Sequence, residues 1–322
     1  MSEIKYSVRR GDSSQRPRRR RLRSLAFVPT LITIGNLLCG FAAIHFGLRA
    51  MYAMAAGATP DWPGHVDPDM LERLLPSFLS VGAGLVFLGM ILDAMDGLIA
   101  RVTRGTTNFG GQLDSLADIV TFGVAPAILM IAFITRELGG EVVVPSPLSP
   151  HLLGRVTWIA GALYVVFAAV RLARFNVEHA EVGFDYRTFR GLPSPAAAAI
   201  VAALILVPDQ PEASGLVPTR VIVYTLPIVA TAVAFLMVSR VPYRRLNRSD
   251  LVGRQPFSRL VLIVVVLAIF FAAKGLTLVA VTSCYVLSAP LDLLLRSIRG
   301  RRPAAAGAHP QRGGSGFRER RA

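Results

Sequence analysis

The chain has 322 residues, of which 53% are hydrophobic and only 17% are charged, and its mean hydropathy is +0.52. A soluble globule of this composition would expose more apolar surface than its charges could cover, so the sequence predicts an all-α polytopic integral membrane protein. The net charge of +15 does not indicate a nucleic-acid-binding protein, because Lys and Arg are concentrated between apolar runs and at the two ends.

The chain begins with 26 mostly polar residues, and six of the eight positions from 16 to 23 are Arg. No small-residue cleavage site precedes the first apolar run, so we expect the first helix to remain as an anchor. Residues 296–322 are rich in Arg, Gly and Ala and lack apolar periodicity. We expect both tails to be disordered and cytoplasmic, where they fix the topology and can touch anionic lipid headgroups.

Between these tails, residues 27–295 are predicted to form one transmembrane domain of about eight helices with both termini cytoplasmic. The apolar segments cover residues 27–48, 77–100, 113–134, 156–174, 194–208, 221–239, 258–273 and 275–295. With this topology the outer loops hold only six of the 35 basic residues: Arg49, Arg73, Arg136, Arg155, Arg220 and Lys274. This asymmetry favours an even number of spans. The last two apolar segments, 258–273 and 275–295, can be separate helices only if Lys274 and Gly275 form a tight turn. One long re-entrant segment would give the same pattern.

Four carboxylates mark the end of the second apolar segment and the start of the third, where charged side chains are costly and usually functional. The pattern is D-x2-D-G-x2-A-R-x8-G-x3-D-x3-D, with fixed positions Asp93, Asp96, Gly97, Ala100, Arg101, Gly110, Asp114 and Asp118. Helical spacing places each pair of aspartates on one stripe, and the short connection lets the two stripes face each other. Such an all-oxygen cluster favours Mg²⁺ or Mn²⁺, and two ions beside a pyrophosphate would support phosphoryl transfer.

Each of these residues also has an ordinary structural interpretation. A single Asp at a helix end is often a solvated cap, a Gly often marks a helix contact, and an Arg beside a span often only anchors topology. Four carboxylates at this spacing favour the metal site, whereas for Gly97 a helix contact remains open and compatible with nucleotide binding.

The motif resembles the signature of the CDP-alcohol phosphatidyltransferases. The resemblance implies that Asp93, Asp96 and Asp114 bind the metal ions and that Asp118, the fourth member of the set, is the base that deprotonates an incoming alcohol. It also implies a CDP-linked lipid donor and a homodimer. The donor would lie against Gly97, Ala100, Arg101 and Gly110.

Four flanking segments resemble the integral-membrane phosphatidylserine synthases of this family: Gly35–Phe41, Leu113–Ala127, Arg171–Val177 and Phe189–Ala198. This resemblance implies transfer of a phosphatidyl group from CDP-diacylglycerol to L-serine, with release of CMP. From the charge pattern we expect the site at the cytoplasmic face, and from the lack of organelle targeting we expect a bacterial inner membrane. One departure is Thr30, which follows Pro29 where the family commonly has Asn. Either the Thr30 hydroxyl or another residue, such as Asn36, would replace that amide.

A serine site needs a cation for the carboxylate and an acceptor for the ammonium group. The candidates are Arg171, Arg174, Asn176 and Arg190, and we expect Arg171 or Arg190 to pair with the carboxylate. Topology arginines are the alternative explanation. The five His and two Cys show no ligand spacing and receive no role.

Two rival functions remain. A sister transferase would use another acceptor, such as glycerol 3-phosphate or an inositol phosphate. A cation-coupled transporter would use the carboxylates as a relay. A relay should spread acidic residues along the membrane depth, whereas these four lie near one face.

Overall fold

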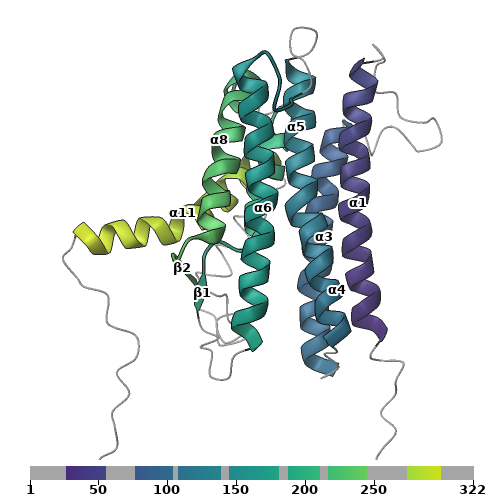
Figure 1. Ribbon diagram of the computed structural model, residues 1–322, viewed down its shortest axis with the longest axis vertical. Helices are drawn as coiled ribbons and strands as arrows, with labels where there is room; N and C mark the ends of the chain where they lie inside the picture. The colour runs from purple at the N-terminus through teal and green to yellow at the C-terminus, as the bar shows by residue number, and fades with distance from the viewer. Residues whose placement is uncertain are drawn as a thin grey trace, which may run out of the picture.

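The computed structural model describes residues 27–55, 77–103, 108–138, 145–180, 188–210, 217–244 and 274–298. In these ranges the chain forms a bundle of long helices that run up and down in turn (Figure 1). The elements are α1 Phe27–Ala55, α3 Phe78–Thr103, α4 Asn108–Asp118, the π-helix η2 Ile119–Val124, α5 Ala125–Glu137, α6 Leu152–Ala180, β1 Thr188–Arg190, α7 Ser194–Leu206, α8 Thr219–Val238, β2 Pro242–Arg244 and α11 Lys274–Ile298.

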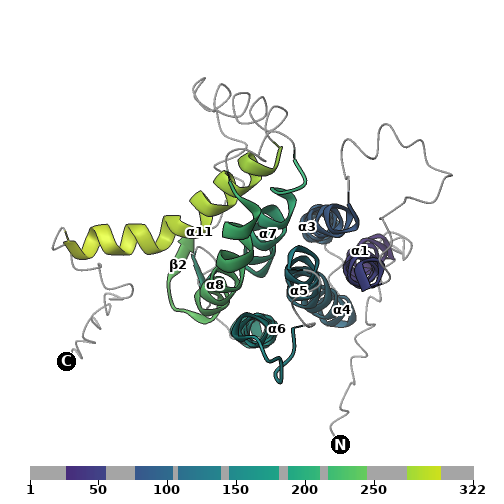
Figure 2. The same ribbon diagram turned by 90° about the horizontal axis from the view of Figure 1, so that it is seen from above.

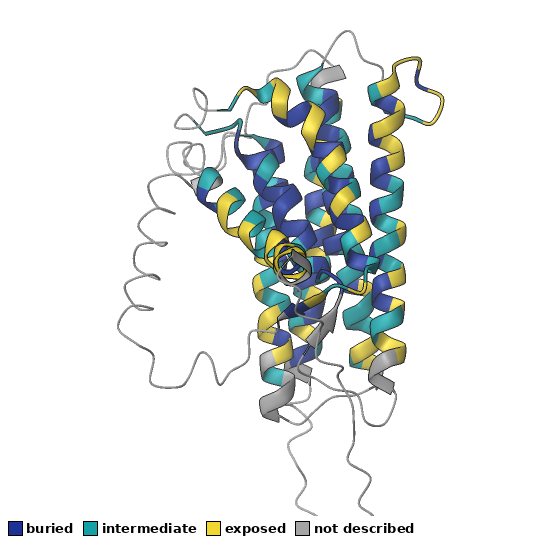
Figure 3. Cartoon of the chain, turned by 90° about the vertical axis from the view of Figure 1, so that its left-hand side faces the viewer, coloured by how far each residue is buried: buried dark blue, intermediate teal, exposed yellow. Residues whose placement is uncertain are grey.

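Six helical segments are long and apolar enough to cross a membrane, which confirms the predicted polytopic all-α class. They are Pro29–Ala53, Phe78–Gly97, Phe109–Glu137, Leu152–Val177, Thr219–Val238 and Leu276–Leu295. The predicted segment 258–273 lies outside the described residues, so the count of eight stays a prediction. Figure 3 shows exposed residues along the outer faces of the helices and buried residues toward the interior of the bundle. Many of the exposed residues are large and apolar, among them Leu38, Phe41 and Ile228, which suits contact with lipid.

The third span is one continuous rod made of α4, η2 and α5, and its middle turn is a π-helix. Proline explains the local change, because Pro126 lacks an N–H and cannot bond to a carbonyl one turn earlier. The N–H of Ala125 donates to Val120 O, five residues back. The carbonyl of Phe122 instead accepts a hydrogen bond from the buried Tyr164 hydroxyl of α6, at 3.1 Å. The π-helical turn begins at Ile119, directly after Asp118.

Helix α7 covers Ser194–Leu206, two residues less than the apolar segment predicted at 194–208. Its 13 residues cover only about 20 Å, which is short of a hydrocarbon core about 30 Å thick. Figure 2 shows α7 enclosed between α3 and α5 on one side and α8 and α11 on the other. Five of its residues are buried alanines, whose small side chains let the neighbouring helices approach closely: Ala197, Ala198, Ala199, Ala202 and Ala203.

Strands β1 and β2 form a short antiparallel ribbon, which was not predicted from the sequence and in which Phe189 pairs with Tyr243. Gly191 follows β1 with φ +86°, and a Cβ there would lie 2.3 Å from Met237 O, so only glycine fits. Burial raises the pKa of Tyr243 to about 12, with a smaller contribution from Tyr285. Its phenol stays protonated at neutral pH and donates to the carbonyl of Val286 in α11, at 2.9 Å.

Helix α11 begins at Lys274, so Lys274 and Gly275 are helical in the structure, not part of a turn. Its first part packs beside α7, and its C-terminal part projects away from the bundle (Figures 1 and 2). Residues 291–295 are all exposed. The helix also contains Pro290, which removes one backbone hydrogen bond and weakens the helix at that point.

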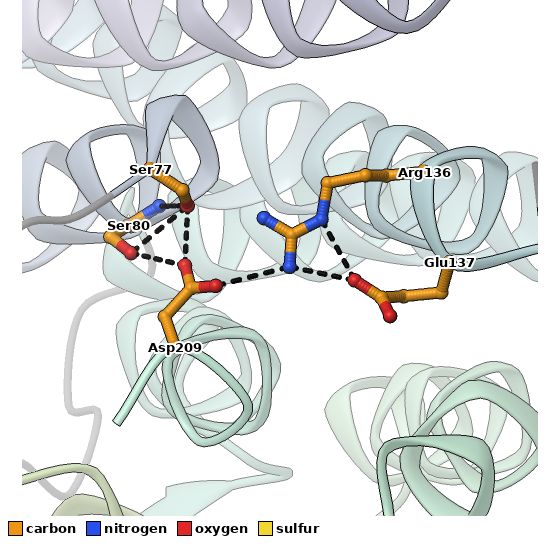
Figure 4. Close-up of polar contacts among 5 residues, drawn as sticks. All are labelled: Ser77, Ser80, Arg136, Glu137 and Asp209. Atoms are coloured by element: carbon orange, nitrogen blue, oxygen red, sulfur yellow. Dashed lines mark hydrogen bonds and ion pairs between the residues drawn. The ribbon is translucent and has the colours of Figure 1, made fainter. Parts of the chain in front are cut away.

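At the upper end of the bundle in Figure 1, a polar cluster ties three helix ends together (Figure 4). The Arg136 guanidinium lies 2.7 Å from a carboxylate oxygen of Glu137 and 3.1 Å from one of Asp209. The hydroxyls of Ser77 and Ser80 donate to the other Asp209 oxygen. The Ser77 hydroxyl also accepts from the Ser80 N–H and so caps α3.

Candidate active site

The four aspartates of the motif lie on consecutive helices at the lower end of the bundle in Figure 1. Asp93 and Asp96 lie near the C-terminal end of α3, and Asp114 and Asp118 lie in the second half of α4. The chain reverses direction between the two helices, so both pairs are brought to the same end, where α1 begins and α6 ends. All four therefore lie at one depth of the bundle, not along a path through it.

Three of the carboxylates form a compact group. Asp93, Asp114 and Asp118 each offer one oxygen, and these oxygens lie within 4.8 Å of one another. Ligands on opposite sides of an octahedral Mg²⁺ lie about 4.2 Å apart, since each bond is about 2.1 Å long. The group therefore has the donor type and nearly the spacing that a hard divalent ion requires, and its residues fit such an ion.

Asp96, which the motif also predicts to bind the metal ions, lies outside this group of three. Its Oδ2 accepts a hydrogen bond from the Thr33 hydroxyl of α1. Its Oδ1 is buried and has no hydrogen-bond partner among the residues that the structure describes. A buried carboxylate oxygen without a donor is costly, and a cation close to it would remove that cost.

The electrostatics of the cluster also favour a cation. Asp93 repels Asp96, and Asp118 repels Asp93 and Asp114. Arg171 of α6, which is only 8% exposed, is close enough to Asp93 and Asp118 to attract both. One guanidinium cannot balance four ionised carboxylates, so among the described side chains a negative charge remains for divalent ions to neutralise.

Helix α1 contributes residues that the sequence analysis did not include in the site. The Asn36 side-chain amide donates to Asp118 Oδ1 at 3.3 Å, and Thr33 holds Asp96 from the same face of α1. The Thr121 hydroxyl donates to the backbone carbonyl of Asn36 at 2.9 Å. The signal available in the sequence was the spacing of three between Thr33 and Asn36, two polar residues facing the same way on an apolar helix.

The acceptor-site candidates have different surroundings. Arg171 donates to the Ser194 hydroxyl at 2.7 Å, and Arg174 donates to the carbonyl of Val238 at 2.9 Å, where it caps the end of α8. The Asn176 amide donates to the Ser115 hydroxyl of α4 at 3.0 Å. Arg190 belongs to β1, and its side chain lies outside the described part of the structure.

The donor-site candidates lie on the same two helices as the carboxylates. Gly97 follows Asp96 directly and is exposed, and Gly110 lies one turn before Asp114. Ala100 and Arg101 continue α3 by one further turn, and their side chains lie outside what the structure describes. The helix backbone thus keeps all four positions near the carboxylates.

Comparison with known proteins gives one family and several named relatives. The family model for CDP-alcohol phosphatidyltransferase matches residues 26–238. Three similar proteins carry the name CDP-diacylglycerol–serine O-phosphatidyltransferase. The one from Helicobacter pylori is 37% identical over 186 residues, which are 58% of this chain and 60% of the relative. The one from Mycobacterium leprae is 28% identical over 263 residues, which are 81% of this chain and 71% of the relative. The one from Methanocaldococcus jannaschii is 33% identical over 132 residues, 41% and 51% of the two chains. The match therefore spans less than two thirds of the Helicobacter protein's length.

Proposed function

The chain belongs to the CDP-alcohol phosphatidyltransferase family, and on that basis we propose that it transfers a phosphatidyl group from CDP-diacylglycerol to L-serine. The products are phosphatidylserine and CMP, so the reaction is a step of phospholipid biosynthesis. The observation that carries the proposal is the group formed by Asp93, Asp114 and Asp118, whose oxygens converge at one end of a membrane-spanning bundle. The names of the relatives support the choice of serine.

In the proposed reaction Asp118 accepts the proton of the serine hydroxyl. The serine oxygen then forms a bond to the lipid-side phosphorus, and the bond from that phosphorus to the bridging oxygen breaks, so CMP departs with the electron pair. No covalent intermediate with the protein is needed, because acceptor and donor meet directly. The role of the chain is to hold both substrates in line and to place one carboxylate beside the hydroxyl.

Asp93, Asp96, Asp114 and Asp118 would hold the metal ions, Mg²⁺ or Mn²⁺ and two in number. When bound, such ions polarise the attacked phosphorus and neutralise charge on the departing phosphate. Gly97 and Gly110 give the nucleotide room to approach the helix backbone, and Arg101 would contact its phosphates. Ala100 completes this donor surface.

We assign the serine carboxylate to Arg171. It is buried beside Asp93 and Asp118, and a guanidinium has five donors, of which the bond to Ser194 uses one. Asn176 would accept a hydrogen bond from the serine ammonium group through its side-chain oxygen, and the bond of its amide nitrogen to Ser115, the neighbour of Asp114, supports this assignment. Arg174 and Arg190 remain further candidates, although Arg174 already binds carbonyls at the end of α8.

The carboxylate end of the bundle would face the cytoplasm of a bacterial inner membrane. Arg171 and Arg174 lie at this end, and positively charged residues favour the cytoplasmic side. The opposite end holds Asp209 and Glu137 beside Arg136. The apolar outward faces would meet lipid and a second copy of the chain in a homodimer.

The test is an assay of CMP release by the purified protein in detergent, with CDP-diacylglycerol, Mn²⁺ or Mg²⁺, and a panel of alcohols. We expect release with L-serine and little with glycerol 3-phosphate or an inositol phosphate. Release with one of those acceptors in place of serine would overturn the choice of alcohol and retain the family chemistry. Cation transport without CMP release would contradict the transferase itself.

A further inference from the structure

We propose that Asn36 is a positioning residue, whose amide fixes the orientation of the Asp118 carboxylate for proton transfer from the acceptor. The proposal rests on the function proposed above, since it assigns Asp118 the role of base. It adds a residue of α1 that lies outside the aspartate motif.

The contact is a direct hydrogen bond between two helices. Asn36 is fully buried, and its Nδ2 donates to Asp118 Oδ1 at 3.3 Å. Burying an amide in an apolar helix is unfavourable unless it is bonded, and Asn36 Oδ1 has no partner among the described residues. A hydrophobic residue would therefore be the expected occupant of this position if packing alone mattered. The buried amide at this position therefore indicates a role beyond packing, which we assign to its bond with Asp118.

A second bond fixes Asn36 relative to the helix that carries Asp118. The Thr121 hydroxyl donates to Asn36 O at 2.9 Å, and Thr121 lies three residues after Asp118 in the π-helical turn. Asn36 of α1 is thus bonded to this span at two points, Asp118 and Thr121, which lie three residues apart. Since π-helical turns are common at functional sites, the unusual turn supports a precise placement of Asp118.

Two glycines leave the space that this arrangement fills. A Cβ on Gly89 of α3 would lie 2.6 Å from the Thr121 methyl carbon and 2.9 Å from Asn36 Oδ1. A Cβ on Gly40 of α1 would lie 2.4 Å from the Thr121 hydroxyl oxygen. The three helices therefore meet closely around Asn36 and Thr121, and the amide has little freedom to turn away from Asp118.

The chemical consequence concerns the rotation of one carboxylate. A free aspartate side chain rotates about its last bond, and only some orientations point a lone pair at the substrate hydroxyl. A donor fixed on Oδ1 restricts that rotation, which leaves Oδ2 in a defined direction. Restriction of this kind raises the rate of the chemical step without strengthening substrate binding.

The experiment compares Asn36→Ala and Asn36→Leu with the unaltered protein, because Leu keeps the branched shape of the Asn side chain without its donor. We expect kcat to fall about 10- to 100-fold in both variants, the loss typical of a hydrogen bond to a charged group. KM for both substrates should change by less than about threefold. Mn²⁺ should still bind, measured by electron paramagnetic resonance without substrate, because Asp93, Asp96 and Asp114 keep their carboxylates. The matched control is Cys39→Ala, one turn along the same buried face of α1, which should keep the original kcat.

An unchanged kcat in both folded variants would overturn the proposal. So would a loss of Mn²⁺ binding and thermal stability in proportion to activity, because that result indicates a structural role. The proposed function is tested separately by the acceptor that the unaltered protein uses. If that acceptor is an alcohol other than serine, the choice of serine fails, and the Asn36 comparison is made with the alcohol that is turned over.

Discussion

Replacing Arg171 by Lys tests the proposed serine site, because it keeps the positive charge and removes the planar guanidinium. Arg171 is 8% exposed, so water screens its contacts weakly, and its bond to Ser194 at 2.7 Å holds it in place. A hydrogen bond to a charged partner contributes about 1.5–3 kcal/mol. At about 1.4 kcal/mol for each factor of ten, its loss should raise the KM for serine about 10- to 100-fold.

The assay is steady-state CMP release with serine and CDP-diacylglycerol varied in turn. KM for CDP-diacylglycerol should stay within about threefold, because the retained charge still offsets Asp93 and Asp118. The comparison variant is Arg174→Lys, which tests the further serine-site candidate on the same helix. Because Arg174 already binds Val238 O, its replacement should lower thermal stability and leave the KM for serine unchanged. Equal increases of both KM values in Arg171→Lys, or the larger serine effect in Arg174→Lys, would refute the assignment.

Five further changes test the site and the fold. Asp118→Asn should abolish turnover and leave CDP binding partly intact, whereas Asp93→Asn should weaken Mn²⁺ and CDP binding together; equal binding losses by calorimetry would mean that the two roles are not separate. Chelation with EDTA should abolish CMP release and excess Mg²⁺ or Mn²⁺ should restore it, while activity that persists in a metal-free preparation would exclude the metal. Arg136→Leu should lower the melting temperature by a few degrees, because it leaves Asp209 without its cation, and should not alter kcat; a large loss of kcat would show that the two ends of the bundle are coupled. Gly191→Ala should also lower the melting temperature, because Ala at φ +86° costs about 1–2 kcal/mol before the contact with Met237 O is relieved; an unchanged melting temperature would contradict the turn described here.

The sequence predicted the parts of the fold that follow from hydropathy and helical spacing. Long apolar runs identify spans because every backbone group must be bonded inside a helix in lipid. The spacing of three and four residues between aspartates places them on helix faces, and the structure brings Asp93, Asp114 and Asp118 together at one end.

The remaining features depend on contacts between distant segments, which local patterns do not contain. Asp96 lies outside the group of three, and Thr33, on another helix, donates a hydrogen bond to it. Asn36 reaches Asp118 only because Gly40 and Gly89 let three helices approach closely. Helix α7 begins where its apolar run begins but ends at Leu206, two residues before that run does, and hydropathy alone did not locate this end.

The central claim is that the carboxylates of α3 and α4 bind divalent ions beside the CDP group. The most direct measurement is anomalous diffraction at the manganese absorption edge from crystals grown with Mn²⁺ and CDP. We expect manganese within coordination distance, about 2.2 Å, of oxygens from Asp93, Asp114 and Asp118, with CDP phosphate oxygens completing the shell. Manganese bound elsewhere, or CDP phosphates remote from these three side chains, would contradict it.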